Sequence, residues 1–395
     1  MVKATFETNY DVVIVGAGPA GSSAAIRLAA LGRRVLLIDK ASFPRHKLCG
    51  EFVSPECLDH LKDLGVMPQV TGQHPQRIDR TVFYSSRGRS FSVASRWLAQ
   101  NNGVSIGLSR RSLDQILLDR AVECGVAVRT EVSVLDVEAA DGRPATISLR
   151  AADGSTHETT TSIVIDATGR GRYVARKFDG LTQSVKPRQV AFKAHLRGAG
   201  IEPGTCEIFS YAGGYGGCSQ VEDGIFNLCF IVDAGLVRSI GSDPMKVLES
   251  TILKNRRAAK VLANIEVVSD WISVPIARYG SMDPAPAEGI IAIGDAAAFI
   301  DPFTGSGIAM ALQSSRLACE AIIGQTEREV IAEAYRTSHA ASFQKRLRVC
   351  RALRYLSDSS NVADTMIAAL SGSSAISRYL ARLTRTSTPP RTSTE

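Results

Sequence analysis

The first forty residues contain apolar runs, the first of which is followed by a short glycine-rich break. A β-branched run from Tyr10 to Val15 precedes this break. An Ala-rich stretch from Pro19 to Leu31 follows it, and a second apolar run spans Val35 to Ile38. Short β-branched runs are typical of buried strands, and the longer Ala-rich stretch is typical of a helix. The pattern therefore predicts a strand, a helix and a second strand at the start of the chain.

The rest of the chain is first strand-rich and then helical. The periodicity predicts short strands over 77–108, a helix over 112–123, strands up to 165 and over 188–233, a helix over 244–263 and a strand-like run over 266–277. A buried parallel strand over 289–293 and a helix over 307–323 follow. Strands that alternate with helices in this way are typical of an α/β fold with a parallel sheet.

This order predicts domains that are discontinuous in sequence. We assign residues 1–75, 104–186 and 278–325 to a Rossmann-like nucleotide-binding domain of α/β class. The inserted segments 76–103 and 187–277 form a β-rich α+β second domain that binds the substrate. A basic helical region is expected over 326–383, followed by a disordered tail over 384–395.

Composition excludes several classes of protein. With 45% apolar and 22% charged residues among 395, the chain is neither intrinsically disordered nor fibrous. The eight Cys show no CxxC pair and no Cys/His ligand spacing, so we expect reduced thiols and no metal site. No apolar leader precedes the first strand and no apolar run reaches the length of a membrane span. These features predict a cytoplasmic protein, either free in solution or peripheral to a membrane.

The net charge of +7 is concentrated at the C-terminus. Residues 341–395 contain nine basic and three acidic side chains. Lys345, Arg346, Arg348, Arg351 and Arg354 recur there at helical spacing. They form either a solvated helix face or a surface that docks an anionic carrier protein or a phospholipid membrane. Nucleic acid is not expected as a partner, because no recognised reading motif is present. The oligomeric state is left open.

The glycine-rich break carries the first binding motif. Gly16, Gly18 and Gly21 form G-x-G-x-x-G between the first strand and the first helix. In such a motif the glycines permit a tight turn, close approach of a pyrophosphate, and close packing of helix on strand. Asp39 ends the second strand at the spacing where an acid meets a ribose hydroxyl, which favours FAD or NAD over NADP. The neighbouring residues included in the expected cofactor contacts are Pro19, Ala20 and Lys40.

A second motif lies near residue 300. Gly294-Asp295 ends a strand, and the sequence Gly305-Ser306-Gly307-Ile308 opens a helix. This arrangement places the Asp295 carboxylate at a strand end and the N–H groups of Gly307 and Ile308 at a helix start. A helix N-terminus there would stabilise negative charge on the pyrimidine edge of a flavin.

Together the two motifs resemble the fingerprints of the p-hydroxybenzoate hydroxylase superfamily of FAD-dependent enzymes, over residues 11 to about 323. The resemblance implies that Asp295 binds the ribityl chain of FAD. The segment Arg111-Ser112-Leu113-Asp114 resembles an R-x-x-D element whose Arg contacts FAD. Asp166-Ala167-Thr168-Gly169-Arg170 resembles a third fingerprint near the flavin and its NAD(P)H reductant.

Two segments favour the geranylgeranyl reductase branch of this superfamily. Lys47-Leu48-Cys49-Gly50 resembles a segment that lies beside the isoalloxazine ring, which implies that Gly50 and Glu51 contact FAD through the backbone. Cys49 would be either a redox-active thiol or part of the wall of the site. Residues 298–307 also resemble this branch more than the aromatic hydroxylases. Trp271-Ile272-Ser273-Val274-Pro275 differs from the halogenase Trp-x-Trp-x-Ile-Pro motif and from the aromatic-x-Trp-x-Phe-Pro substrate motif of the reductases.

Three functions remain open. In the first, the enzyme reduces a C=C bond of an apolar isoprenoid, lipid-like or polyketide substrate. In the second, it is a monooxygenase that hydroxylates an aromatic or polyketide substrate, and in the third a non-enzymatic flavin or lipid carrier. His195 and Tyr211 are the candidate proton donors. The aromatic residues expected to line an apolar substrate cavity are Phe192, Phe209, Tyr215, Phe226 and Phe230.

Overall fold

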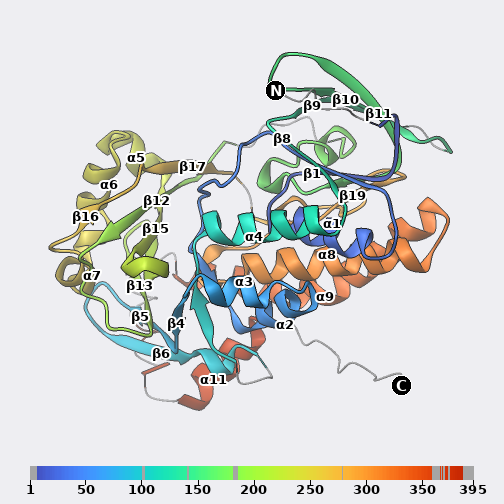
Figure 1. Cartoon of the computed structure of the whole chain (residues 1–395). Helices are drawn as coiled ribbons and strands as arrows, with labels where there is room; N and C mark the ends of the chain where they lie inside the picture. The colour runs from blue at the N-terminus through green and yellow to red at the C-terminus, as the bar shows by residue number, and fades with distance from the viewer. Residues whose placement is uncertain are drawn as a thin grey trace.

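The computed structural model describes residues 7–99, 103–139, 142–180, 186–277, 279–357, 365, 367, 370–371 and 374–385. Figure 1 shows two lobes, one around the strands near the N-terminus and one around β12, β13 and β15. Helices α1, α4, α8 and α9 run side by side in the first lobe. The fold is mixed α/β, as the sequence predicts.

Among the described residues, the first lobe contains a seven-stranded sheet in the order β8-β2-β1-β11-β10-β9, with β19 also paired to β11. Strands β8, β2, β1, β11 and β19 are parallel, and β10 and β9 join as antiparallel neighbours. The strands are β1 (Asn9–Val15), β2 (Val35–Asp39), β8 (Ala127–Thr130), β9 (Ser133–Glu138), β10 (Ala145–Arg150), β11 (Thr156–Asp166) and β19 (Ile290–Ala292).

Helices cover one face of this sheet. Helices α1 (Pro19–Ala29), α4 (Arg110–Glu123) and α8 (Gly307–Gly324) pack with α2 (Pro55–Asp63) and α9 (Arg328–Ser357) into one apolar core. The carboxyl ends of β1, β2, β11 and β19 meet at one edge, which is where ligands bind in open parallel sheets. The first nucleotide motif and the Gly294-Asp295 turn both follow strands at this edge.

The second lobe is built on an eight-stranded sheet, again among the described residues. Its order is β16-β12-β15-β14-β13-β5-β6, with β17 also paired to β12. The strands are β5 (Arg80–Tyr84), β6 (Ser90–Ala94), β12 (Gln189–Arg197), β13 (Thr205–Tyr211), β14 (Gly214–Gln220), β15 (Phe226–Asp233), β16 (Glu266–Val267) and β17 (Ile272–Ile276). Helices α5 (Ala234–Ile240), α6 (Pro244–Ser250) and α7 (Arg256–Val261) share a core with one face of this sheet.

Smaller elements connect the two lobes. A three-stranded sheet contains β3 (Phe52–Val53), β4 (Gln76–Ile78) and β7 (Ser105–Gly107), and a two-stranded sheet contains β18 (Gly280–Ser281) and β20 (Ala298–Phe299). Helix α3 (Met67–Gly72) follows α2. Since the chain passes between the large sheets several times, both are discontinuous in sequence.

The helix predicted over 244–263 is divided into two. Helix α6 ends at Ser250, a 3₁₀ turn spans Ile252–Lys254, and α7 begins after Asn255. The Asn255 side chain accepts hydrogen bonds from the N–H groups of Arg257 and Ala258 and caps α7. Its amide also donates to the carbonyls of Ser85 and Ser210. The apolar periodicity continues across the break, because both helices pack on the same sheet face.

The disordered tail was placed too early in the sequence. Helix α11 (Ser374–Leu383) is followed by Thr384, which is only 7% exposed. Arg385 donates hydrogen bonds to the carbonyl of Thr304 and to Ser306 Oγ. It also forms an ion pair with Glu56. Tertiary contacts with residues far away in sequence therefore order Thr384 and Arg385, and the rest of the predicted tail, 386–395, lies outside the described residues.

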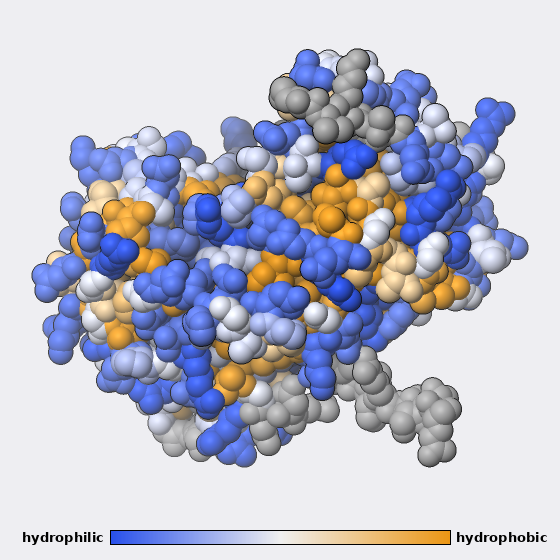
Figure 2. Space-filling view, in the orientation of Figure 1, coloured by the Kyte–Doolittle hydropathy of each residue, from blue (hydrophilic) through white to orange (hydrophobic). Residues whose placement is uncertain are grey.

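The basic region of α9 is also less uniform than its spacing suggests. Arg346 is buried and forms an ion pair with Glu56, whereas Lys345, Arg348 and Arg351 are exposed. The side chain of Arg354 lies outside the described residues. In the face shown in Figure 2, hydrophilic residues predominate and apolar residues gather in separate patches. Within the described part of the chain, no helix has both the length and the apolarity that crossing a bilayer requires.

Asp166 organises the chain after β11, and replacing it tests this part of the fold. Its buried carboxylate accepts hydrogen bonds from the N–H groups of Thr168, Val174 and Ala175. We expect Asp166→Ala to leave these donors unsatisfied and to lower the free energy of unfolding by about 3 kcal/mol or more. Urea unfolding followed by circular dichroism measures this change.

Asp136→Ala is the matched control, because the Asp136 carboxylate is exposed and pairs with Lys177 at the surface. This variant should unfold at the urea concentration of the native chain. Equal shifts in the two variants would mean that the hydrogen bonds of Asp166 do not stabilise the fold.

Candidate functional site

A cavity of about 1490 Å³, which we call the central cavity, is lined by residues from both large sheets. Pockets for one small ligand are usually about 300–1,000 Å³, so the central cavity has room for more than one ligand. Its wall includes the first glycine motif, the end of β2, residues 45–52 and the turns before and after β20. The second sheet and α11 contribute the remaining wall.

Two helix N-termini open onto the central cavity. Neither Gly18, at the N-terminus of α1, nor Ser306, at the N-terminus of α8, provides a side-chain hydrogen bond to cap its helix. Gly18, Pro19, Gly307 and Ile308 all line the cavity. Free N–H groups and the positive end of the helix dipole favour an anionic ligand at each position.

The three glycines of the first motif have different surroundings. A Cβ atom on Gly16 would lie 2.4 Å from the carbonyl oxygen of Ala167, and one on Gly21 would lie 1.8 Å from that of Gly16. A Cβ on Gly18 would meet only Arg110 Nη2, at 3.5 Å. Gly16 and Gly21 are therefore required by backbone packing, whereas Gly18 leaves space that belongs to the cavity. Gly21 itself does not line the cavity.

The carboxylate at the end of β2 is held firmly at the cavity wall. Asp39 Oδ2 accepts hydrogen bonds from Ala17 N at 2.8 Å and Arg45 Nη2 at 3.0 Å, and Oδ1 accepts one from Ala41 N. Lys40 also lines the cavity. The position of Asp39 beside the glycine turn is the one expected for a carboxylate that binds a ribose hydroxyl.

Asp295 faces the cavity, and among the described residues its carboxylate has no hydrogen bond or ion pair. Burial raises the pKa of its carboxyl group, while Arg170, Arg110 and Lys47 act in the opposite direction. A half-buried carboxylate with free acceptor positions is suited to accept hydrogen bonds from ligand hydroxyl groups. The part of the cavity formed by the two helix N-termini, Asp39 and Asp295, which we call the cofactor end, therefore fits FAD. The helix N-termini suit the phosphates and the flavin, and the two carboxylates suit hydroxyl groups.

Arg110, not Arg111, is the arginine of the helix start. Ser109 caps α4, so the helix begins at Arg110, two residues before the predicted start. Arg110 and Asp114 are four positions apart, which places both on one helix face, and Arg110 Nε lies 2.6 Å from Asp114 Oδ1. Arg110 lines the central cavity, whereas Arg111 is exposed and does not. The assignment of Arg111 to the cofactor is therefore corrected to Arg110.

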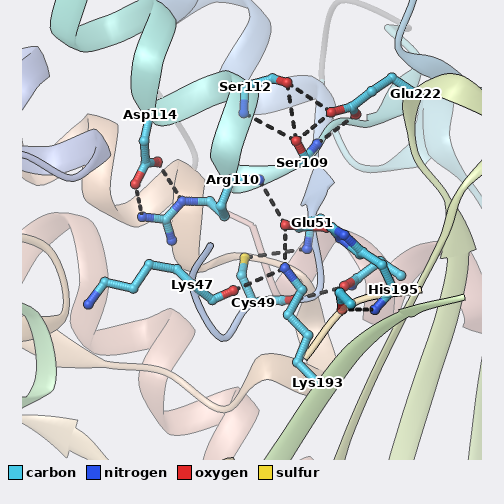
Figure 3. A network of polar contacts seen from close by, with 12 residues as sticks. Lys47, Cys49, Glu51, Ser109, Arg110, Ser112, Asp114, Lys193, His195 and Glu222 are labelled. Atoms are coloured by element: carbon cyan, nitrogen blue, oxygen red, sulfur yellow. Dashed lines mark hydrogen bonds and ion pairs between the residues drawn. The ribbon is translucent and has the colours of Figure 1, made fainter. Parts of the chain in front are cut away.

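Figure 3 shows a polar network between the loop 47–51 and the second sheet. Glu51 is completely buried, and Lys193 Nζ and Arg110 N donate hydrogen bonds to its Oε1 at 2.5 and 2.8 Å. His195 Nε2 lies 2.6 Å from Oε2 of the same carboxylate. Burial alone would raise the pKa of Glu51, but the hydrogen bond with His195 and the charge of Lys193 outweigh this effect and lower it. Glu51 is therefore an ionised carboxylate at neutral pH.

The predicted proton donors lie outside the cavity lining. His195 reaches the cavity only through Glu51, which lines it. Tyr211 is buried on the other side of the sheet and donates hydrogen bonds to the carbonyls of Tyr215 and Ile231. Burial raises the pKa of its hydroxyl group well above the ordinary value. Tyr211 therefore has no contact with the cavity, contrary to our expectation.

The alternation of side chains along the strands of the second sheet explains which aromatic residues line the cavity. Phe192, Phe209 and Phe230 pack into the core beneath α5–α7, because successive strand residues point to opposite faces. The cavity face instead presents Ile208 and Ile231, one residue away along the strands. Of the aromatic residues proposed from the sequence, only Tyr215 lines the cavity. Phe226 packs against the core.

Most of the remaining predicted site residues line the central cavity. Those that line the central cavity are Gly16, Gly18, Pro19, Ala20, Asp39, Lys40, Cys49, Gly50, Glu51, Asp295, Gly305, Gly307 and Ile308. Sequence reasoning missed Lys193 and Arg385. A lysine within the apolar strand sequence around Phe192 was a usable signal for the first, whereas nothing local distinguishes Arg385 from other basic residues of the tail.

Within the described ranges, no group of three or more His, Cys, Asp and Glu side chains is arranged to hold a metal ion. The described cysteines are all free thiols. Cys49 is half-buried, and its Sγ accepts a hydrogen bond from Glu51 N at 3.3 Å.

Comparison with known proteins identifies the cofactor class. The FAD binding domain family matches residues 9–345, most of the chain. The chain is 30% identical over 345 residues to digeranylgeranylglycerophospholipid reductase 2 of Methanopyrus kandleri, covering 85% of this chain and 81% of that protein. It is 28% identical to menaquinone reductase of Mycolicibacterium smegmatis, covering 79% and 76% of the two chains.

Among solved structures, a geranylgeranyl bacteriochlorophyll reductase-like protein of Thermoplasma acidophilum has a TM-score of 0.78 at 20% identity. The match covers 94% of this chain and 95% of that one. At this identity the likeness concerns the fold. The fold and the central cavity define an FAD-dependent oxidoreductase, an enzyme whose FAD is reduced by NAD(P)H. The chain belongs to the geranylgeranyl reductase-like family of these flavoproteins.

Two substitutions test the cofactor site. Gly18→Val places a side chain in the space that the glycine leaves at the N-terminus of α1, and Asp295→Ala removes the free carboxylate. We expect each variant to fold but to purify with at least about tenfold less FAD, since each loss is worth about 1.4 kcal/mol or more. Absorbance near 450 nm relative to that of the protein measures the bound FAD.

Gly72→Val is the control, because a Cβ at this exposed position meets no atom within 4 Å and lies outside the cavity. It should purify with the native amount of FAD. Fully yellow Gly18→Val and Asp295→Ala proteins would refute the assignment of this end of the cavity to FAD.

Proposed function

We propose that the protein reduces a carbon–carbon double bond in an isoprenoid or other lipid-like substrate. The observation that carries this proposal is the apolar part of the central cavity, beyond the residues that fit FAD. The apolar residues there are Phe83, Phe91, Val93, Leu98, Ile208, Ile231, Leu370, Leu380 and Ala381. They come from the second sheet, from neighbouring segments and from α11, and they suit a long hydrocarbon chain.

The relatives support this choice of substrate class. Two of them are named as reductases, one of a digeranylgeranylglycerophospholipid and one of menaquinone. A brominase of a pyrrole carried on a peptidyl-carrier protein, from Pseudoalteromonas luteoviolacea, is 25% identical to this chain. The reductases therefore favour a lipid-like substrate, while the brominase leaves oxygen-dependent chemistry as an alternative for the experiment to exclude.

Reduction of C=C to CH–CH consumes one NAD(P)H and one proton and releases NAD(P)⁺. Bound FAD supplies the step that takes two electrons from NAD(P)H and passes them to the substrate. The protein must also supply the proton that the substrate takes up. The Cys49 thiol and the Tyr215 hydroxyl both line the central cavity and can donate a proton. Tyr215 donates its hydrogen bond to Asp301, which fixes the direction of the hydroxyl.

The N-terminus of α8 has a second task in this reaction. The N–H groups of Gly307 and Ile308 stabilise negative charge beside them, because the helix dipole is positive at this end. Apolar side chains on the opposite wall exclude water from the reacting carbons. The same cavity therefore combines an electrostatic site for the cofactor with a dry site for the substrate.

A single experiment separates reduction from hydroxylation. FAD-loaded protein is mixed with NADH or NADPH without oxygen, and loss of absorbance near 450 nm shows which nucleotide reduces it. A geranylgeranyl lipid is then added, with and without air. We expect the product mass to rise by about 2 Da per reduced bond, with no need for oxygen.

A rise of about 16 Da that requires one O₂ per product would overturn the proposal in favour of a monooxygenase. A protein that takes up electrons from neither nucleotide would also overturn it. Protein without the lipid is the matched control for oxygen that is consumed without product.

We also propose that α11 rests on an anionic phospholipid surface. Its inner face lines the central cavity through Ser377, Leu380 and Ala381. Its outer face exposes Ile376 and Tyr379 to 52% and 64%. Arg378 and Arg382 are exposed on the same helix. Apolar and basic residues side by side on the outer face of an amphipathic helix suit a membrane interface with anionic headgroups.

Sedimentation with vesicles tests this surface. We expect the native protein to bind phosphatidylglycerol vesicles more tightly than phosphatidylcholine vesicles. Removing two positive charges in Arg378→Gln/Arg382→Gln should weaken binding about thirtyfold, because each charge contributes about 1 kcal/mol at such a surface.

The control Arg33→Gln/Arg34→Gln removes two exposed charges outside α11 and should bind as the native protein does. Equal binding by both double variants, or native binding that does not change between low and high salt, would exclude α11 as the contact with the membrane.

A further inference from the structure

The loop 47–51 forms part of the wall of the central cavity but has no regular secondary structure of its own. Lys47, Leu48, Cys49, Gly50 and Glu51 all line the cavity. The structure assigns no helix or strand to these residues, and Glu51 adopts a φ of +53°, which is unusual for a residue with a side chain. The position of this loop must therefore be fixed by contacts from outside it.

Three side chains of the second sheet make these contacts. Lys193 Nζ donates hydrogen bonds to the carbonyl of Lys47 at 3.1 Å and to Glu51 Oε1 at 2.5 Å. Asn227 Nδ2 donates to the carbonyl of Cys49 at 3.1 Å. His195 Nε2 meets Glu51 Oε2 at 2.6 Å. Between them, the three side chains hold the loop at its first, third and fifth residues.

The register of the sheet brings these side chains together. Lys193 and His195 are two residues apart on β12 and point to the same face. Asn227 on β15 is the direct partner of His195 across the ladder. This face is opposite to the one that packs beneath α5–α7. The three residues thus form a compact polar group on one face of the sheet.

Stability alone does not account for this group. A buried ion pair such as Lys193 with Glu51 is often no more stabilising than apolar residues of the same volume, because both charges lose their water. Asn227 also leaves its buried Oδ1 without a hydrogen-bond partner. Unlike apolar packing, the hydrogen bonds of this polar group are directional, so they fix the orientation of the loop residues that they contact.

We propose that Lys193, His195 and Asn227 are positioning residues that clamp the loop 47–51 against the cofactor end of the central cavity. The clamp fixes the Cys49 thiol and the backbone at Gly50 relative to bound FAD. Through Arg110 N, which donates to Glu51 Oε1, the clamp also joins the second sheet to the start of α4. This role is independent of which substrate the enzyme reduces.

Thiol labelling of FAD-loaded protein tests the clamp. Cys49 and Cys124 are both half-buried, and Cys124 lies at the far end of α4, so it serves as an internal reference. Asn227→Leu replaces the amide with an apolar side chain of similar size and so removes the donor to the carbonyl of Cys49. We expect the rate of maleimide labelling at Cys49 relative to Cys124, measured by mass spectrometry, to rise about tenfold.

The visible spectrum of bound FAD provides a second measurement. The absorption maximum should shift in Asn227→Leu, because the loop beside the cofactor changes its position. Lys193→Met should have a larger effect on both measurements, since it removes two contacts. Lys193→Met could fail to fold because the buried Glu51 carboxylate loses its ion pair with the lysine. In that case Lys193→Met/Glu51→Gln removes the charge of Glu51 without restoring the contact to the Lys47 carbonyl.

Asn255→Leu is the matched control. Asn255 is also a buried asparagine of the second lobe that donates to backbone carbonyls, but it does not line the cavity or contact the loop. It should lower stability and leave the labelling ratio and the FAD spectrum unchanged.

Two outcomes would overturn the clamp. One is a native labelling ratio and FAD spectrum in both Asn227→Leu and the Lys193 variant. The other is an equal rise of the labelling ratio in Asn255→Leu, which would indicate a general loosening of the lobe. Neither result bears on the proposed reduction of a double bond, because no substrate is used.

Discussion

The buried carboxylate of Glu51 is the interaction on which the arrangement of the site depends. It accepts hydrogen bonds from α4 through Arg110 N and from β12 through Lys193, and its other oxygen meets His195. A fully buried charge is tolerated only when it is paired and hydrogen-bonded, so the two lobes must meet in one geometry to satisfy it. Residues of both lobes line the central cavity. Its shape therefore depends on how the two lobes meet at Glu51.

The cofactor end of the cavity could be predicted because its determinants are local. Gly16 and Gly21 are required by contacts of less than 3 Å between a Cβ and the backbone, and such contacts leave a direct trace in the sequence. Asp39 and Asp295 follow strands, so their positions at the carboxyl edge of the sheet depend only on recognising those strands. Arg111 was assigned from the resemblance of residues 111–114 to a four-residue element, and such a resemblance does not show that Asp114 pairs with Arg110, one helix turn away.

The substrate end could not be predicted in the same way. Strand alternation divides residues between two faces, but the sequence does not say which face the helices cover. Phe209 and Tyr211 lie under α5–α7, and Ile208 faces the cavity, which reverses the expected assignment. Lys193, Asn227 and Arg385 find their partners more than 75 residues away in sequence, at Lys47, Cys49 and Thr304. Contacts at such separations depend on the packing of whole lobes, which no local pattern specifies.

The contrast between the two ends of the cavity also limits the chemistry that it can support. The helix N-termini, Asp295 and the loop 47–51 bring charged groups to one side of the cavity. The second sheet and α11 present mainly apolar side chains, with Arg385, just beyond α11, as a charged exception. In a site of low polarity, the dipole of α8 acts on neighbouring charge with little screening. In the proposed reaction, a hydrocarbon substrate gains its binding energy from burial against the apolar side chains rather than from hydrogen bonds. The proposed reaction therefore requires the reacting atoms to lie at the boundary between these two environments, where the protein sets the electrostatics and the substrate itself excludes water.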